Sequence, residues 1–342
     1  MKICIYGAGA IGGYMGVLLK RAGFDVSLIA RGAQLEAIKA KGCELRIADK
    51  IYVEAMPASK NPADFGEQDY VIIGLKAHQA WETAEDLRPL LAPNTAVVTA
   101  QNGVPWWYFY GLDAPYTNCR LASVDPYNRQ WNAIGPERVI GCTVYPATET
   151  LEPGVIQHIY GNQFGLGEPN RKPSERVQRL ADALAAAELK ARIYDDIRDD
   201  IWVKLWGNLC FNPISALTQA TLDIVATDPA TRALSRNMML EAKAIGDKLG
   251  ANFRVDVDRR IDGAAKVGAH KTSMLQDLLK GRPLEIDALV TAVQEMGQIT
   301  GTATPYIDAV LGLVQQLGRV RGLYPTFPEV EMAEPVQAAC AS

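Results

Sequence analysis

The sequence contains little histidine, and its cysteines show no paired spacing. Three histidines among 342 residues leave few imidazole ligands for a metal ion. The six cysteines are scattered, without the short spacings of a metal site or of a disulfide framework. We therefore expect neither a bound metal nor a disulfide. The residues concerned are His78, His158 and His270, and Cys4, Cys43, Cys119, Cys142, Cys210 and Cys340.

Long apolar runs and an excess of positive charge are also lacking. No run reaches the roughly 18 apolar residues of a membrane-spanning helix. A formal net charge of -4 offers no basic field for nucleic acid. The chain starts directly with a predicted strand, without a basic and apolar leader segment. These absences predict a cytoplasmic protein that binds neither membranes nor nucleic acids.

Length and patterning predict two domains. A chain of 342 residues with 48% hydrophobic residues can fill two cores. Residues 1–196 alternate strands and helices in the pattern of a parallel sheet, and short antiparallel strands between 139 and 167 are expected to extend that sheet. Residues 197–321 have a helical period almost throughout, so we expect an all-helical second domain. The tail, residues 322–342, shows no periodicity.

A glycine-rich turn near the N-terminus is the most informative motif. The run Gly7-Ala8-Gly9-Ala10-Ile11-Gly12 follows a predicted strand and opens a predicted helix, which is the setting of a dinucleotide-binding turn. Gly7 permits the tight turn, Gly9 lets the backbone approach a pyrophosphate, and Gly12 lets the helix pack on the strand. The backbone of Ala10 and Ile11 then faces the phosphates at the helix N-terminus. An ordinary strand-to-helix turn is the alternative.

The end of the second strand indicates which dinucleotide binds. NAD sites usually place an acidic residue there for the ribose 2′-hydroxyl, whereas this chain has Ala30-Arg31-Gly32. A cation at this place suits the 2′-phosphate of NADPH. The alternative is that Arg31 is a solvated loop charge.

Polar residues follow two further predicted strands. Lys76 and Gln79 come after the strand that ends at Leu75, and Asn102 comes after the strand that ends at Ala100. Ligands of open parallel sheets lie outside the carboxyl ends of the strands, so these side chains are candidate ligand contacts. Each is a single polar residue, and a plain loop position is the alternative.

The second half contains a polar stripe in an apolar helix. Lys204, Asn208 and Asn212 are spaced by four residues, which places them on one face. Desolvation can pull the pKa of a buried lysine toward neutrality and suit it to proton transfer. The alternative is a lysine at a helix start and two asparagines that cap neighbouring elements. Ser273 and Glu285 each stand near the start of a later predicted helix, where an N-cap or a first-turn carboxylate is the routine explanation.

Together these motifs resemble the ketopantoate reductase (2-dehydropantoate 2-reductase) family from Met1 to about Arg321. Its ordered elements are Gly7–Gly12, Lys76-Ala-His-Gln79, Gln101-Asn102-Gly103, Lys204-xxx-Asn208-xxx-Asn212-Pro213, Ser273-Met274 and Glu285-Ile286-Asp287. The resemblance implies a Rossmann-type α/β domain followed by an all-α domain like the C-terminal domain of 6-phosphogluconate dehydrogenase. It also implies reduction of a 2-oxo acid, ketopantoate for the named enzyme, with NADPH as the cofactor.

The resemblance further implies a role for each site residue. Lys204 is the general acid, and Ser273 and Asn102 bind the carboxylate region of the substrate. Asn208, Asn212 and Glu285 hold substrate hydroxyl groups. The cofactor is bound by Gly7, Gly9, Ala10, Ile11, Gly12, Arg31, Lys76, Gln79 and Asn102.

One segment leaves the substrate open. Between Gly103 and Val139 the chain is longer and more aromatic than a minimal family member, with Pro105-Trp-Trp-Tyr-Phe-Tyr110 directly after the Asn102 loop. These side chains either shape a pocket for another bulky 2-oxo acid or related carbonyl compound, or pack against the helical domain or a second subunit of a homodimer. A non-catalytic NADPH-binding sensor is the alternative from a different class.

Overall fold

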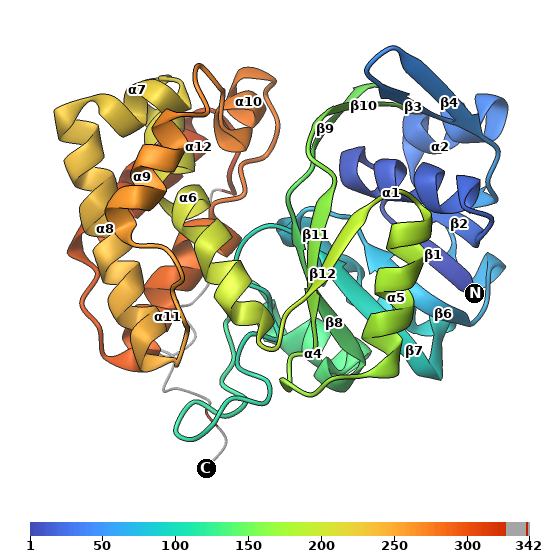
Figure 1. Ribbon diagram of the computed structural model, residues 1–342, viewed down its shortest axis with the longest axis horizontal. Helices are drawn as coiled ribbons and strands as arrows, with labels where there is room; N and C mark the ends of the chain where they lie inside the picture. The colour runs from blue at the N-terminus through green and yellow to red at the C-terminus, as the bar shows by residue number, and fades with distance from the viewer. Residues whose placement is uncertain (326–339, 341–342) are drawn as a thin grey trace. The chain divides into compact units, whose positions relative to one another are not determined.

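The computed structural model describes residues 1–325 and 340, and the chain divides into two compact units (Figure 1). The first comprises Met1–Asn102 and Tyr127–Ile197, and the second comprises Gly103–Pro126 and the chain from Arg198 onward. The sequence prediction assigned the whole of 1–196 to the first domain, whereas 103–126 groups with the second unit. Most of the predicted tail, residues 326–339, 341 and 342, lies outside the described residues.

An eight-stranded sheet forms the centre of the first unit. The strand order is β12-β11-β8-β7-β6-β1-β2-β5, and all neighbours are parallel except β8 and β11. From β5 to β8 this is the order of a doubly wound dinucleotide-binding sheet, with its switch point between β1 and β6. The strands are β1 (Lys2–Tyr6), β2 (Asp25–Ile29), β5 (Ala58–Ser59), β6 (Gln68–Ile73), β7 (Leu91–Ala100), β8 (Val139–Val144), β11 (Gln163–Gly167) and β12 (Lys190–Ile193).

A separate four-stranded sheet corrects one expectation. Residues 139–167 were expected to extend the large sheet, and β8 and β11 do so. However, β9 (Ala147–Glu152) and β10 (Val155–Tyr160) pair with β3 (Cys43–Ile47) and β4 (Lys50–Glu54) in the order β4-β3-β10-β9. Here β10 runs parallel to β3, which is more than 100 residues away in sequence. A pattern of alternating residues fixes the faces of a strand but not its partner, so this pairing could not be predicted.

Helix α1 (Ala10–Arg21) packs between the two sheets. One side of it buries Met15 and Leu19 in the core that also contains β1 and β2. On the other side a Cβ added to Gly13 would lie 2.8 Å from Ile156 of β10. The four-stranded sheet therefore holds α1 against the large sheet, which fixes the helix whose N-terminus carries the glycine turn.

The remaining helical segments of the first unit alternate with its strands. The segment after β6 is not one continuous α-helix: a single α-turn, α3 (Ala77–Ala80), is followed by the 3₁₀-helix η2 (Trp81–Leu90). The other segments are α2 (Gly32–Lys41), η1 (Pro62–Asp64), α4 (Arg129–Ile134), η4 (Pro136–Arg138) and α5 (Glu175–Ala186). The short 3₁₀-helix η3 (Pro126–Asn128) lies where the chain passes from the second unit back into the first.

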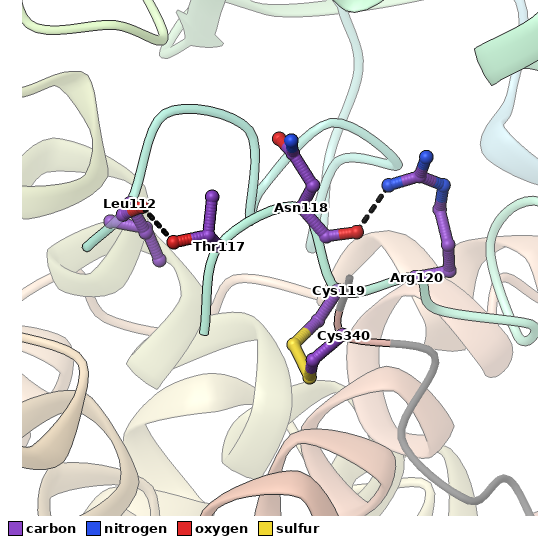
Figure 2. Close-up of a disulfide and its surroundings, with 6 residues drawn as sticks. All are labelled: Leu112, Thr117, Asn118, Cys119, Arg120 and Cys340. Atoms are coloured by element: carbon purple, nitrogen blue, oxygen red, sulfur yellow. Dashed lines mark hydrogen bonds between the residues drawn. A yellow bond between two sulfur atoms is a disulfide. The ribbon is translucent and has the colours of Figure 1, made fainter. Parts of the chain in front are cut away.

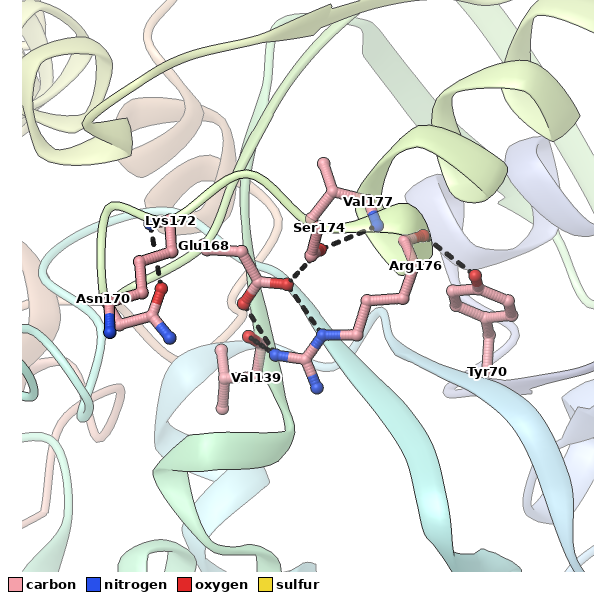
Figure 3. Close-up of polar contacts among 8 residues, drawn as sticks. All are labelled: Tyr70, Val139, Glu168, Asn170, Lys172, Ser174, Arg176 and Val177. Carbon is pink, nitrogen blue, oxygen red and sulfur yellow. Dashed lines mark hydrogen bonds and ion pairs between the residues drawn. The ribbon is translucent and has the colours of Figure 1, made fainter.

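A buried ion pair anchors the start of α5 to the sheet (Figure 3). Arg176 donates to both oxygens of Glu168, at 2.7 and 2.6 Å, and to the Val139 carbonyl at 3.2 Å. Ser174 caps α5 by accepting from Val177 N–H and donates its own hydroxyl hydrogen to Glu168. Because Glu168 is only 5% exposed, these donors offset the cost of burying its charge.

The second unit consists largely of helices near their predicted positions. Its longest helix runs without a break from Ile197 through Pro213 to Thr218. Proline removes a single N–H donor and the buried neighbours hold the helix together. The helices are α6 (Ile197–Thr218), α7 (Leu222–Thr227), α8 (Pro229–Lys248), α9 (Val257–Ala265), α10 (Ser273–Leu279), the π-helical turn η5 (Asp287–Thr291), α11 (Ala292–Thr300) and α12 (Pro305–Val320).

The aromatic segment belongs to the core of this second unit. Trp106, Trp107, Tyr108 and Phe109 are each at most 3% exposed. Buried Arg198 donates to the carbonyls of Tyr108 and Tyr110, both at 2.7 Å. This burial favours the packing interpretation of the segment over a pocket lined by its rings.

A disulfide joins Cys119 of this segment to Cys340 (Figure 2), so the expectation of no disulfide was wrong. The two residues are 221 positions apart in sequence, and their Cα atoms lie 4.1 Å apart. Spacing along the chain gives no sign of such a pairing, which only tertiary proximity creates. The other four cysteines are buried free thiols.

The described residues contain neither a membrane-spanning helix nor a cluster of metal ligands. Within 1–325 and 340, no helix combines the length and the apolar character needed to cross a membrane. The same residues contain no group of three or more His, Cys, Asp or Glu side chains arranged to hold a metal ion.

Candidate functional site

The glycine turn connects β1 to α1 at the switch point of the large sheet. Gly7 has φ +103°, and the N–H groups of Gly7 and Ala8 both donate to the Ile29 carbonyl, at 3.0 and 3.1 Å. A Cβ on Gly12 would lie 2.1 Å from the Gly7 carbonyl oxygen, so only glycine allows the helix this close to the turn. The turn is therefore tied to the end of β2 and to the first turn of α1.

The N-terminus of α1 is open to an anionic group. Gly9 occupies the N-cap position and no side chain caps the helix. A Cβ added at Gly9 would meet no atom within 4 Å. The N–H groups of Ala10 and Ile11 open the helix, and unsatisfied N–H groups at a helix start attract phosphate. This arrangement fits the pyrophosphate of a dinucleotide.

Lys76 and Gln79 follow β6 beside this turn. Gly74 N–H donates to the Tyr6 carbonyl at 3.0 Å, which joins the two strand ends at the switch point. Lys76 is the N-cap residue of α3 and is partly buried, and Gln79 is exposed in the same turn. The side chain of Gln101, at the end of β7, donates to the Leu75 carbonyl at 2.9 Å, which fixes the loop that leads to Lys76.

Arg31 stands at the N-cap position of α2, directly after β2. Its side chain is 64% exposed, and its guanidinium lies 3.8 Å from the carboxylate of Asp86. An exposed pair at this distance is weak, so the guanidinium can turn toward another anion at little cost.

His78, between Lys76 and Gln79, is a residue that the sequence prediction did not assign to the site. Burial, and next the positive charge of Lys76, lower its pKa to about 4. Its Nδ1 is buried without a hydrogen-bond partner. Its position two residues after Lys76, within Lys76-Ala-His-Gln79, was the only available signal in the sequence.

The polar stripe of the second unit lies on α6 as predicted by its spacing. Lys204 and Asn208 are partly buried and Asn212 is 4% exposed. Their apolar flanks, Trp202 and Trp206, are fully buried. The stripe therefore presents an ammonium and two amides from a largely apolar stretch of the helix.

The structure brings Asn212 and Ser273 together. The Asn212 amide donates to the Ser273 hydroxyl at 3.2 Å. Thr272, not Ser273, caps α10, since its hydroxyl accepts from Leu275 N–H at 3.3 Å. The N-cap explanation for Ser273 is thus excluded, and its hydroxyl is engaged with the stripe.

Glu285 is partly buried in the stretch that enters η5. The predicted residues therefore fall into two sets. The first unit holds Gly7, Gly9, Ala10, Ile11, Gly12, Arg31, Lys76, Gln79 and Asn102, and the second holds Lys204, Asn208, Asn212, Ser273 and Glu285.

Comparison with known proteins covers both units. A family model described as ketopantoate reductase PanE/ApbA matches residues 3–107, and one described as its C-terminal part matches residues 196–318. A 2-dehydropantoate 2-reductase of Mesorhizobium japonicum is 55% identical over 325 residues, which are 95% of this chain and 100% of the relative. All predicted site residues lie inside the two matched ranges.

Solved structures agree with this match. A candidate ketopantoate reductase from Ralstonia solanacearum has a TM-score of 0.90 at 42% identity, covering 94% of this chain and 99% of that one. A 2-dehydropantoate 2-reductase from Geobacter metallireducens has a TM-score of 0.81 at 30% identity, covering 93% and 100%. The predicted combination of a Rossmann-type α/β domain with an all-helical domain is confirmed.

Proposed function

Because the chain belongs to the ketopantoate reductase PanE/ApbA family, we propose that it reduces 2-dehydropantoate (ketopantoate) to pantoate with NADPH. The observation that carries this proposal is the 55% identity to a 2-dehydropantoate 2-reductase across 95% of the chain. The glycine turn, the Lys204 stripe and the contact of Asn212 with Ser273 support it from the structure.

The chemistry divides between cofactor and protein. NADPH, when bound, supplies the hydride, and the ketone oxygen then gains negative charge. The Lys204 ammonium stabilises that charge and donates the proton, so it acts as the general acid.

The remaining side chains bind and orient the substrate. Asn102 and Ser273 bind the carboxylate region, while Asn208, Asn212 and Glu285 hold the hydroxyl groups. The Asn212 amide keeps the Ser273 hydroxyl in place. An amide and a hydroxyl held in this way lose less freedom when the substrate binds.

Cofactor contacts come from the first unit. The backbone at Gly7, Gly9, Ala10, Ile11 and Gly12 binds the pyrophosphate. Arg31 pairs with the 2′-phosphate in exchange for its weak contact with Asp86. Lys76, Gln79 and Asn102 complete the cofactor set.

The test is NADPH oxidation against a panel of 2-oxo acids that includes 2-dehydropantoate and 2-oxo-3-methylbutanoate. We expect the highest kcat/KM on 2-dehydropantoate. Lys204→Ala should lower kcat by about 10²-fold or more, as expected for loss of a general acid, while NADPH still binds. Lys39→Ala, at an exposed position of α2, is the control. Normal turnover by Lys204→Ala would assign the proton to another donor.

A different bulky 2-oxo acid or related carbonyl compound is the second candidate substrate. It would require the aromatic segment to shape the pocket, and the burial of Trp106 and Trp107 argues against that. The panel decides, since a preference for a bulkier acid would replace 2-dehydropantoate in the proposal. A sensor without turnover would leave every member of the panel unreduced.

Location and assembly remain predictions. We propose that the enzyme works in the cytoplasm without nucleic-acid or membrane partners, and that it forms a homodimer. The disulfide counts against the cytoplasm, because stable disulfides are uncommon in reducing compartments. Cell fractionation tests the location, and light scattering of the purified protein tests the dimer.

A further inference from the structure

The stretch that contains Glu285 is held by residues close to the C-terminal end of the described chain. The Leu284 N–H donates to the Leu323 carbonyl at 2.9 Å, and Leu323 N–H in turn donates to the Gly318 carbonyl of α12 at 2.8 Å. Two residues after Glu285, the Asp287 carboxylate accepts from the Tyr324 hydroxyl at 2.6 Å. Glu285 thus lies between two anchors that both come from Leu323-Tyr324.

Tyr324 is built firmly into the second unit. Only 6% of it is exposed, and its hydroxyl also accepts from the Gln315 amide at 3.3 Å. The Arg319 guanidinium lies 5.6 Å from the centre of its ring. A side chain with this packing and these partners has one orientation, so its hydroxyl presents a fixed hydrogen-bond donor to Asp287.

Asp287 in turn fixes the start of a π-helical turn. Its carboxylate also accepts from the Thr291 hydroxyl at 2.8 Å. In the same turn the Ile286 carbonyl accepts from Val290 and Thr291 N–H, and the second of these bonds spans five residues. Such turns are rare and occur often at functional sites. Burial raises the pKa of Asp287, and the Tyr324 hydrogen bond opposes this by favouring the charged form.

The same stretch anchors the chain that follows Asn102. Val104 N–H donates to the Ala288 carbonyl at 2.8 Å. Gly103 has φ +92°, and a Cβ there would lie 2.4 Å from the Ala288 carbonyl oxygen. The turn after Glu285 therefore contacts the aromatic segment at its first residues.

We propose that Tyr324 and Asp287 are positioning residues that hold Glu285 at the place where it binds the substrate hydroxyl. The inference rests on the proposed function. Tyr324 lies beyond the range 196–318 matched by the family model, so the anchor is supplied by a part of this chain that the model does not cover. Neither residue needs to touch the substrate, because their hydrogen bond acts through the backbone that follows Glu285.

A double-mutant cycle tests the proposal. Tyr324→Phe removes the hydroxyl and keeps the ring, and Glu285→Gln removes the charge that binds the substrate. In the wild-type background Tyr324→Phe should raise KM for 2-dehydropantoate by about three- to tenfold, the range for losing one hydrogen bond, with kcat within about twofold and the Kd of NADPH unchanged. In the Glu285→Gln background the same substitution should have little further effect on KM.

Two variants and a binding measurement complete the design. Asp287→Asn keeps the volume and should reproduce the KM effect, whereas Tyr306→Phe at a 45% exposed position of α12 should change nothing. The cycle is repeated on the Kd of 2-dehydropantoate for the NADP⁺ complex, which needs no turnover. Equal effects of Tyr324→Phe with and without Glu285, or none on KM and Kd, would overturn the positioning role. A wild-type protein that binds but does not reduce the acid would instead overturn the proposed function.

Discussion

Arg31 is the residue that should distinguish the two nicotinamide dinucleotides. Its ion pair with Asp86 spans 3.8 Å at the surface and is easily exchanged for a phosphate. Arg31→Ala should weaken NADPH binding by roughly 1.5–3 kcal/mol, the range for hydrogen bonds to charged groups, and leave NADH nearly unaffected. Titrating the protein with each dinucleotide and following its fluorescence measures the two dissociation constants.

The matched control for Arg31 is Arg88→Ala, which removes an equally exposed arginine that pairs with Glu85. It should leave the affinity for both dinucleotides as in the wild type. If Arg31→Ala lost the same affinity for NADPH and for NADH, the side chain would not bind the 2′-phosphate.

His78 gives the first unit a pH dependence in the absence of cofactor. Its pKa in the folded protein is lowered to about 4 by burial and by Lys76, from 6.5 in the unfolded chain. Between these values the unfolded chain binds a proton that the folded protein does not, so stability falls as the pH drops from 6.5 to 4. His78→Gln should reduce this loss, as measured by urea unfolding at pH 7 and pH 5. An unchanged loss would place its cause at other groups.

At the scale of single elements, two glycines of the glycine turn have different roles: Gly12 is needed for folding, and Gly9 for cofactor binding. A Cβ at Gly12 would lie 2.1 Å from a backbone oxygen, whereas a Cβ at Gly9 meets nothing within 4 Å. Gly12→Ala should therefore destabilise the protein by roughly 1–3 kcal/mol or more, as for overpacking. Gly9→Ala should unfold at the wild-type temperature yet bind NADPH more weakly, because its methyl group occupies the approach of the pyrophosphate.

Differential scanning calorimetry and NADPH titration of the two variants give the answer together. Wild-type affinity in Gly9→Ala would mean that the pyrophosphate lies elsewhere. Wild-type stability in Gly12→Ala would mean that the turn can open without cost.

The elements that the sequence predicts are those set by local periodicity. The strand, the glycine turn and the helix at residues 2–21 follow from the order of apolar and glycine residues, and the stripe on α6 follows from its spacing of four. The pairing of β10 with β3 and the π-helical turn after Glu285 do not, because both depend on contacts between distant parts of the chain. Asp287 was part of a recognised motif, yet nothing local indicated that Tyr324 would bind it.

At the scale of the whole molecule, the sequence predicts the two sets of site residues from residue type and spacing. It does not predict the disulfide or the hydrogen bonds between residues that are distant in sequence. Buried Glu295 accepts hydrogen bonds from Ala122 N–H and from both N–H and hydroxyl of Ser123, across more than 170 residues. Burial raises the pKa of Glu295, and these three donors oppose that rise. A lone glutamate within a helical pattern carries no sign of such a role.

The disulfide between Cys119 and Cys340 is the most extended of these links and gives the last prediction (Figure 2). Purified without reductant and then denatured, the protein should show four thiols, those of Cys4, Cys43, Cys142 and Cys210, and six after reduction. Because a cross-link limits the unfolded chain, reductant should lower the free energy of unfolding by roughly 2–5 kcal/mol. Cys340→Ser should show five thiols and a stability that no longer depends on reductant, whereas Cys142→Ser should show three and keep that dependence. Six thiols in the wild-type protein before reduction would mean that the bond does not form.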